Sequence, residues 1–497
     1  MYTLGVDLGT NSVKCLVLNL ESGEPTGLSQ NEYGYTLVDG YLEQRPEDVW
    51  NEVVNCIKKS LTKVKEEDIS VSQIRAVGLS GQMHGSIMYN SAGHEISNII
   101  TWEDERCDQI LLDEIREIGG DDVDKSGCGI ATGYLGPTVY HSFTRDARYQ
   151  KDDIAHVLLP TDWLRQRLTG QQTFRTDPSN GSSSGFFHTQ NRNWNFNLIE
   201  KLGLPAGIFP EVAPAELVDG SICREVSSCT SLEEGIPVII GGGDQPMSMI
   251  GSGISQKSET MLVNIGTGSQ VSVVGDYHKE KETIVFCFPQ SGFSLLGAAL
   301  SGGAALQWWR NISEECASMF GVKNFGGNIY SMMDKIAGSV CPGSDGLTFI
   351  PFLNGTRVNP DLTASFTGIR RNHTYGNMIK AVMEGVVFEL YHLSLKIGDY
   401  SSNTRLMGAG GGLSSSLWKQ ITADIFGKEL KSALYKEQAA SGAALMAGVE
   451  IGVYSDVNEA CGKVKYSEEV TEPIEQNVDI YRQIYRNQYI SGFTDPI

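Results

Sequence analysis

The chain has 497 residues, 40% of them hydrophobic, and a formal net charge of −21 at pH 7. Its length exceeds what a single core usually supports, so we expect two domains. The negative charge would repel nucleic acid and anionic lipid, so neither nucleic acid nor a membrane is an expected partner. A nucleotide could still bind where backbone N–H groups and a metal ion neutralise its phosphates.

The first half of the chain alternates strand-like and helical segments, which is the pattern of α/β proteins. Residues 4–7 and 13–20 read as two strands joined by a turn at 9–12, so they predict a tight hairpin. Pro46 and the acidic residues after it predict the first turn of a helix, and apolar residues follow at helical spacing. Another strand is expected at 74–79.

The second half repeats this opening design. Residues 235–240 predict a buried strand that ends in three glycines, and residues 261–274 repeat the order of strand, Gly-Thr turn and strand. We interpret the second half as a diverged copy of the first, which predicts two similar lobes with a ligand cleft between them.

The two Gly-Thr hairpins are suited to holding phosphates. Glycine lets the backbone approach a phosphate closely, so that its amides can donate hydrogen bonds. One such turn alone is better explained as an ordinary hairpin, but two copies, one in each half, favour phosphate binding. Asp7 could hold Mg²⁺ through water. The expected phosphate ligands are Gly9, Thr10, Lys14, Gly266 and Thr267.

A third glycine cluster lies at 407–413, after a strand-like segment and before a helical one. A helix N-terminus without bulky side chains can seat an adenosine or phosphate group, so we assign this cluster to the nucleotide rather than to a flexible loop. The residues assigned are Gly410, Gly411, Gly412 and Ser414. The P-loop pattern GxxxxGK[ST] is absent from the sequence.

Asp244 follows the three glycines at the expected boundary between the lobes. A carboxylate there could accept the proton of a substrate hydroxyl as it attacks the γ-phosphate of ATP. The pattern alone supports a helix N-cap equally well.

Two polar loops after predicted strands offer groups that hydrogen-bond sugar hydroxyls. They are Gln82, Met83 and His84 in one loop, and Trp102, Asp104 and Arg106 in the other. A structural histidine is the alternative for His84. Residues 181–185 match the GxSxG pattern of hydrolases, but they follow a predicted turn rather than a strand, so we reject that chemistry.

Along nearly its whole length the chain resembles the FGGY carbohydrate kinases. The shared motifs occur in the family's order: DLGT at 7–10, GLSGQMHG at 78–85, WEDER at 102–106, GGGD at 241–244, GTG at 266–268, GGAALQW at 302–308, ASFTGI at 364–369 and GGG at 410–412. The resemblance implies that Asp244 is the catalytic base and that Gly303 and Gln307 line the nucleotide. The family's N-terminal signature, a Lys followed by a Trp, is absent from residues 133–146.

The resemblance implies two ribonuclease-H-like α/β domains of the actin and hexokinase superfold, at 1–243 and 244–497, around a central cleft. It implies that ATP and Mg²⁺ are used to phosphorylate the terminal hydroxyl of a ketose. Xylulose and sedoheptulose are the two leading candidates, and a homodimer is one option for the assembly. The alternatives are a nucleotide-driven chaperone-like or actin-like ATPase and a sugar sensor without catalytic activity.

The start of the sequence and its cysteines bear on the compartment. No basic or apolar leader segment opens the sequence, and no stretch approaches the roughly 18 apolar residues that cross a bilayer. The ten cysteines are scattered singly, without a CxxC pair or metal-ligand spacing. We therefore expect a cytoplasmic protein with reduced thiols.

Overall fold

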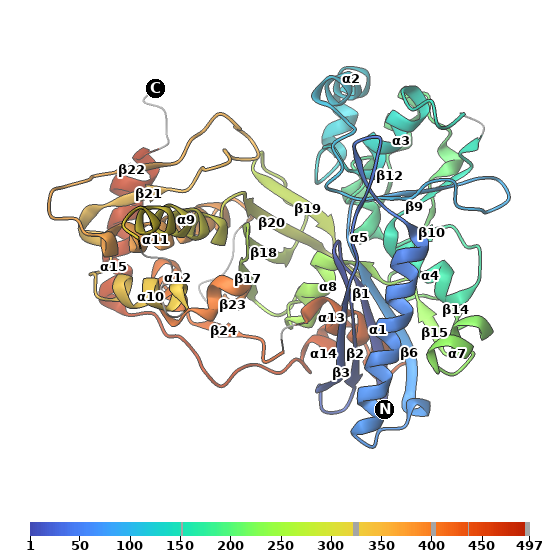
Figure 1. The fold of residues 1–497 in the computed structure, drawn as a ribbon. Coiled ribbons are helices and arrows are strands. Elements are labelled where there is room, and N and C mark those ends of the chain that lie inside the picture. Colours follow the sequence, from blue (N-terminus) through green and yellow to red (C-terminus); the bar gives the residue numbers. More distant parts are fainter. Residues whose placement is uncertain (151–152, 322–327, 399–403, 436, 493–497) are drawn as a thin grey trace.

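The computed structural model describes residues 1–150, 153–321, 328–398, 404–435 and 437–492. Two lobes are visible in Figure 1, each built on a mixed sheet. The strands of the first sheet, in spatial order, are β14 (Val218–Ser221), β15 (Pro237–Ile239), β6 (Ile74–Gly81), β1 (Tyr2–Leu8), β2 (Ser12–Asn19) and β3 (Pro25–Glu32), and β16 (Gly242–Gly243) also pairs with β6.

The second sheet repeats the plan of the first. Its strands, in spatial order, are β19 (Thr283–Cys287), β20 (Phe293–Ala299), β18 (Ser269–Gly275), β17 (Thr260–Ile265), β23 (Arg405–Ala409) and β24 (Leu430–Ser432). In each sheet a hairpin with a Gly-Thr turn, β1–β2 or β17–β18, is antiparallel, and the next inner strand, β6 or β23, runs parallel to the first strand of that hairpin. The repeat predicted from the sequence is therefore present.

Helices cover the sheets and fill the space between them. They are α1 (Pro46–Glu66), α2 (Gln109–Gly119), α3 (Leu135–Thr144), α4 (Pro160–Thr169), α5 (Pro178–Gly181), α6 (Phe196–Lys201), α7 (Arg224–Thr230), α8 (Asp244–Gly251), α9 (Gly303–Met319), α10 (Ile329–Gly338), α11 (Tyr375–Ser394), α12 (Ser416–Phe426), α13 (Gln438–Glu450), α14 (Val457–Cys461) and α15 (Glu475–Ile484). None of the described helices has both the length and the apolarity needed to cross a membrane.

Short strands form separate small sheets outside the two large ones. They are β4 (Thr36–Val38) with β5 (Tyr41–Gln44) and β8 (Ile99–Ile100), β7 (Ile87–Tyr89) with β9 (His156–Leu158), β10 (Arg175–Thr176) with β13 (Glu211–Val212), β11 (Phe187–His188) with β12 (Asn193–Trp194), and β21 (Thr348–Ile350) with β22 (Ser365–Thr367).

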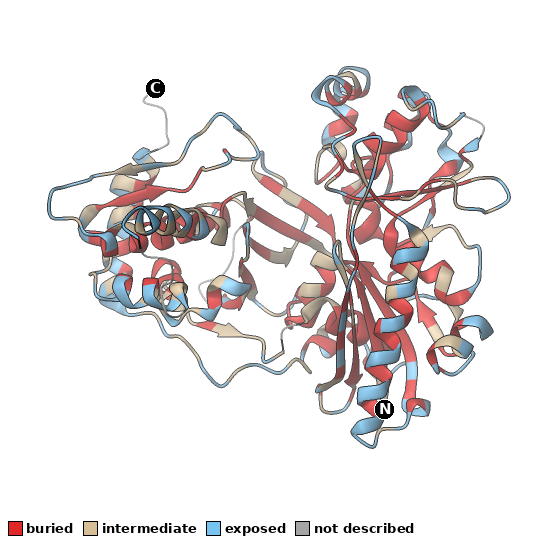
Figure 2. Cartoon of the chain, viewed as in Figure 1, coloured by how far each residue is buried: buried red, intermediate tan, exposed pale blue. Residues whose placement is uncertain are grey.

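Helix α1 shows why the predicted elements form. Pro46 opens the helix, where its missing N–H costs nothing, and two acidic residues in the first turn complement the helix dipole. The apolar stripe Val49, Val53, Ile57 and Leu61 is buried against the first sheet, whose inner strands β6, β1 and β2 are buried along most of their length (Figure 2). The helix is amphipathic, and burial of this stripe holds it in place.

Helix α13 belongs to the second half of the chain but packs on the first sheet. A Cβ at Gly78 of β6 would lie 1.8 Å from the Ala443 carbonyl oxygen, and one at Gly442 would lie 1.9 Å from that of Met247 in α8. Glycines thus permit a very close approach of backbones. Because α8 and α13 share one core with strands of both sheets, the domain boundary after Gly243 stays a prediction.

Candidate active site

Asp244 is the first residue of α8, directly after β16. The sequence predicted it at the end of a continuous buried strand, but the chain bends at Gly241, whose φ is +82°, and β15 ends at Ile239. The cap residue of α8 is Gly243, whose amide donates to Ser179 Oγ at 2.9 Å. The partly buried Asp244 carboxyl therefore starts a helix, where the dipole favours negative charge.

Asp7 lies near Asp244 because both are held through β6. Asp7 and Gly242 are each paired with Ser80, and Ser80 Oγ donates to Asp7 Oδ1 at 2.8 Å. Burial raises the pKa of Asp7 above its usual value. Burial, followed by the nearby charge of Asp7, raises the pKa of Asp244 to about 7. A carboxyl with this pKa is suited to accept a proton near neutral pH.

The first Gly-Thr hairpin lies beside Asp7. The Gly9 amide donates to the Ser12 carbonyl at 3.0 Å, which closes the turn, and Thr10 Oγ1 accepts from Trp102 Nε1 at 2.9 Å. Lys14 on β2 forms an ion pair with Glu437 of the second half, with an N–O distance of 2.8 Å. A phosphate contact by Lys14 stays a prediction, and such a contact would compete with Glu437.

The second Gly-Thr hairpin borders a large cavity in the second lobe. The Gly303 amide donates to the Gly266 carbonyl at 2.7 Å, which ties the start of α9 to the hairpin. The cavity measures about 760 Å³, a size typical of ligand sites. Its lining includes the predicted residues Gly266, Thr267, Gly303, Gln307, Gly411, Gly412 and Ser414. Gly410 adjoins this lining.

The Gln82–His84 loop continues β6, which extends to Gly81. Gln82 is buried, its Nε2 donates to Gln44 Oε1 at 3.3 Å, and its own Oε1 has no partner among the described residues. Met83 is buried against Phe286 of β19. His84 stacks on Tyr134 with a ring distance of 4.0 Å. The loop thus offers an unpaired acceptor and an imidazole close to both lobes.

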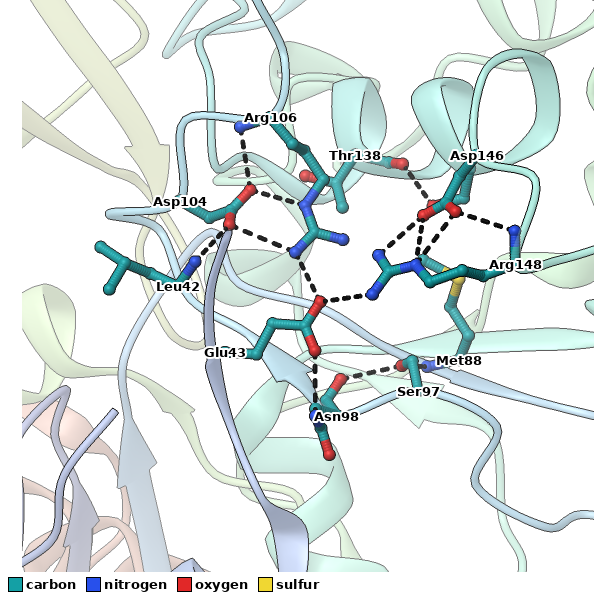
Figure 3. Close-up of polar contacts among 11 residues, drawn as sticks. Leu42, Glu43, Met88, Ser97, Asn98, Asp104, Arg106, Thr138, Asp146 and Arg148 are labelled. Atoms are coloured by element: carbon teal, nitrogen blue, oxygen red, sulfur yellow. Dashed lines mark hydrogen bonds and ion pairs between the residues drawn. The ribbon is translucent and has the colours of Figure 1, made fainter. Parts of the chain in front are cut away.

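Asp104 and Arg106 are engaged in a buried ion-pair network (Figure 3). Arg106 Nε donates to Asp104 Oδ1 at 2.6 Å and Nη2 donates to Glu43 Oε1 at 2.8 Å, while the Leu42 amide donates to Asp104 Oδ2 at 2.9 Å. Arg148 also reaches Glu43, at 3.2 Å. These contacts brace the loop that carries the exposed Trp102, and Arg106 Nη1 is the donor left unpaired among the described residues.

The structure also brings residues to this region that sequence reasoning missed. Gln270 Nε2 of β18 donates to Gln245 Oε1 at 2.6 Å, which links the second hairpin to the residue after Asp244. Arg357 lies close enough to His84 to lower its pKa. Tyr134, which stacks on His84, lies in residues 133–146, the segment that lacks the family's N-terminal signature. Of these residues, only Gln245 could have been found from the sequence, because it directly follows Asp244.

Comparison with known proteins identifies the family. Models of the N-terminal and the C-terminal domain of the FGGY family of carbohydrate kinases match residues 2–251 and 261–451. The chain belongs to the FGGY family of carbohydrate kinases. The resemblance inferred from the motifs and the predicted class of enzyme, an ATP-dependent sugar kinase, are thereby confirmed, and the chaperone-like and sensor alternatives are not favoured.

Curated relatives of this FGGY kinase include a xylulose kinase of Staphylococcus epidermidis, 27% identical over 97% of this chain and 94% of the relative. A gluconokinase of Bacillus subtilis is 26% identical over 97% of this chain and 94% of the relative. Among solved structures, a ligand-bound xylulose kinase from Lactobacillus acidophilus has a TM-score of 0.86 and 21% identity, covering 99% of this chain and 97% of that one. The predicted two-domain fold of the actin and hexokinase superfold is confirmed.

Proposed function

We propose that this carbohydrate kinase transfers the γ-phosphate of ATP to the terminal hydroxyl of a ketose, with Asp244 as the general base. The observation that carries the proposal is the pair of Asp7 and Asp244. Burial and the charge of Asp7 raise the pKa of Asp244 to about 7, which suits a base that must hold a proton briefly near neutral pH.

Asp7 is the residue that would hold Mg²⁺, through water. Mg²⁺ usually keeps several waters and binds one or two carboxylates together with substrate phosphates. The residues fit this mode, because the Asp7 carboxyl lies close enough to Asp244 for its charge to contribute to the raised pKa of Asp244, and a cation near the two carboxyls would neutralise that charge. The ion supplies charge neutralisation on the transferring phosphoryl group.

The nucleotide would occupy the cavity of about 760 Å³ in the second lobe. Amides of Gly9 and Thr10 on one side and of Gly266 and Thr267 on the other would donate to its phosphates. The adenosine would lie against Gly411 and Gly412, where the cavity wall carries no side chains.

The sugar would bind at the Gln82–His84 loop and Trp102. These side chains offer hydrogen-bond acceptors, an aromatic surface and an apolar wall, which suits a polyhydroxylated ligand. Xylulose and sedoheptulose remain the two leading candidates. One added carbon changes the free energy by which a pocket discriminates between two substrates by only about 1–3 kcal/mol. A homodimer stays a prediction.

A substrate panel tests this function. We expect ADP release by the purified protein with ATP and Mg²⁺ to depend on sugar, and to be fastest with xylulose or sedoheptulose among a panel that also contains ribulose, gluconate and glycerol. ADP release at the same rate without sugar, or highest turnover with gluconate or glycerol, would contradict the proposal.

A further inference from the structure

The serine-rich segment 177–185 lies directly against the proposed sugar loop. The sequence predicted a turn at its start, but Pro178–Gly181 forms the one-turn helix α5, which is capped by Asp177 through the amides of Ser179 and Asn180. Ser182, Ser183 and Ser184 are fully buried. The segment that matched a hydrolase pattern therefore has no exposed nucleophile. Its hydroxyls accept hydrogen bonds from neighbouring segments instead, Ser182 Oγ from the Cys287 amide and Ser183 Oγ from the His84 amide.

Ser183 makes two hydrogen bonds with His84. The His84 amide donates to Ser183 Oγ at 3.0 Å, and His84 Nδ1 lies 2.7 Å from the Ser183 carbonyl oxygen. A carbonyl oxygen can only accept, so Nδ1 must carry the hydrogen. In a neutral imidazole with Nδ1 protonated, Nε2 is a bare acceptor.

The backbone of His84 needs the support that Ser183 gives. Its φ is +74°, in the left-handed region that few residues other than glycine adopt. The hydrogen bond from the His84 amide to Ser183 Oγ holds this conformation and aims the ring at Tyr134. Ser183 thus fixes both the position of the ring and the hydrogen on it.

The surroundings of His84 also favour the neutral ring. Tyr134 stacks on it at 4.0 Å with an interplanar angle of 11°, and Phe286 of the second lobe approaches with a ring distance of 5.8 Å. Burial lowers the pKa of His84 to about 4; the charge of Arg357 also lowers it, while the Ser183 carbonyl acts in the opposite direction. His84 is therefore uncharged at neutral pH.

We propose that Ser183 is a positioning residue that holds His84 as the neutral Nδ1–H tautomer, so that Nε2 accepts a hydrogen bond from a hydroxyl of the sugar. This inference rests on the proposed function and sharpens it. The group that meets His84 must donate a hydrogen, so the substrate presents a hydroxyl there, not a carboxylate.

The tautomer can be observed directly by ¹⁵N NMR of the folded, full-length protein. The chain has 8 histidines, and the His84→Gln variant assigns the signal of His84. We expect the Nδ1–H tautomer, with no titration between pH 5 and 8. The Nε2–H tautomer, or a charged ring at pH 7, would overturn the inference.

Kinetics of Ser183→Ala provide the second test. We expect the KM for the best sugar of the panel to rise about 2- to 10-fold, the loss of one hydrogen bond, and the KM for ATP to stay unchanged. The ¹⁵N signal of His84 should also move. Ser184→Ala, which removes an equally buried hydroxyl that accepts only from the Phe186 amide, is the matched control and should change neither.

The outcomes separate the two proposals. A wild-type protein that phosphorylates a ketose but carries the Nε2–H tautomer overturns this inference and leaves the proposed function standing. A protein that phosphorylates no sugar of the panel overturns the proposed function, and with it the inference, whatever the tautomer.

Discussion

Asp7 and Asp244 are two carboxyls that the sheet holds close together. Asp7 is paired with Ser80 of β6 and accepts a hydrogen bond from it, and the two residues before Asp244 are paired with the same strand, so β6 keeps the two carboxyls near each other. Burial, followed by the charge of Asp7, raises the pKa of Asp244 to about 7, and burial raises the pKa of Asp7 above its usual value. A cation bound between them would relieve the repulsion between their charges, as would the transfer of a proton to Asp244.

The raised pKa of Asp244 predicts a pH dependence. Because its pKa rises from 3.8 to about 7, the carboxyl is protonated below pH 7 and ionised above it. A general base acts only when ionised, so kcat/KM for the ketose should fall about tenfold per pH unit below pH 7 and level off above it.

The Asp244→Asn variant is the control for this profile, because ATP also titrates near pH 7. Its residual turnover lacks the proposed base and should lose the acid limb, whereas a limb caused by ATP would stay in place. A wild-type profile that is flat from pH 5 to 8 would contradict the assignment of Asp244.

At the level of elements, α13 joins the two halves by backbone contact. Glycines allow α13 to lie against both β6 and α8. A Cβ at Gly78 of β6 or at Gly442 of α13 would lie within 2 Å of a carbonyl oxygen of the facing element. The cores of well-packed proteins tolerate such added atoms poorly, because neither backbone can yield without shifting a whole element.

Gly442→Ala should therefore lower stability. We expect a loss of at least about 1–3 kcal/mol, the usual cost of overpacking, seen as a lower Tm in calorimetry. Gly338→Ala at the end of α10 is the matched control, because no described atom lies within 4 Å of its Cβ position. Its Tm should stay within about 1 °C of wild type, and equal Tm values for both variants would contradict the packing argument.

For the whole molecule, local sequence pattern predicted the repeated sheets and the glycine motifs because these depend on neighbouring residues. The stripe of α1 and the hairpins follow from spacing alone. Contacts between distant residues could not be predicted this way. The Gln245–Gln270 bond, the approach of Arg357 to His84, and the packing of α13 on the first sheet arise only when both lobes are folded.

In the candidate site, too, local motifs could be predicted from the sequence, whereas contacts between distant residues could not. The motifs predicted Asp7, Asp244 and residues that line the cavity of the second lobe, since glycine clusters and strand ends are visible in the sequence. They did not reveal that Asp104 and Arg106 are occupied by Glu43 and each other, because that ion pair depends on the fold of β5.

The assignment of Mg²⁺ to Asp7 predicts that metal and sugar bind independently. Chelation of divalent ions with EDTA should abolish phosphoryl transfer, because the transferring phosphoryl group loses its neutralising charge. It should leave the rise in Tm caused by the ketose alone unchanged, since Asp7 lies outside the Gln82–His84 loop. Transfer that persists in EDTA, or a lost ketose effect on Tm, would contradict this assignment.

The role of Asp244 is tested most directly by the ketose-dependent turnover of Asp244→Asn. Asn keeps the size of the side chain but cannot accept a proton, so kcat should fall by at least about 10²-fold while the Tm shift caused by ADP stays as in wild type. A turnover close to that of wild type would contradict the assignment of Asp244 as the general base.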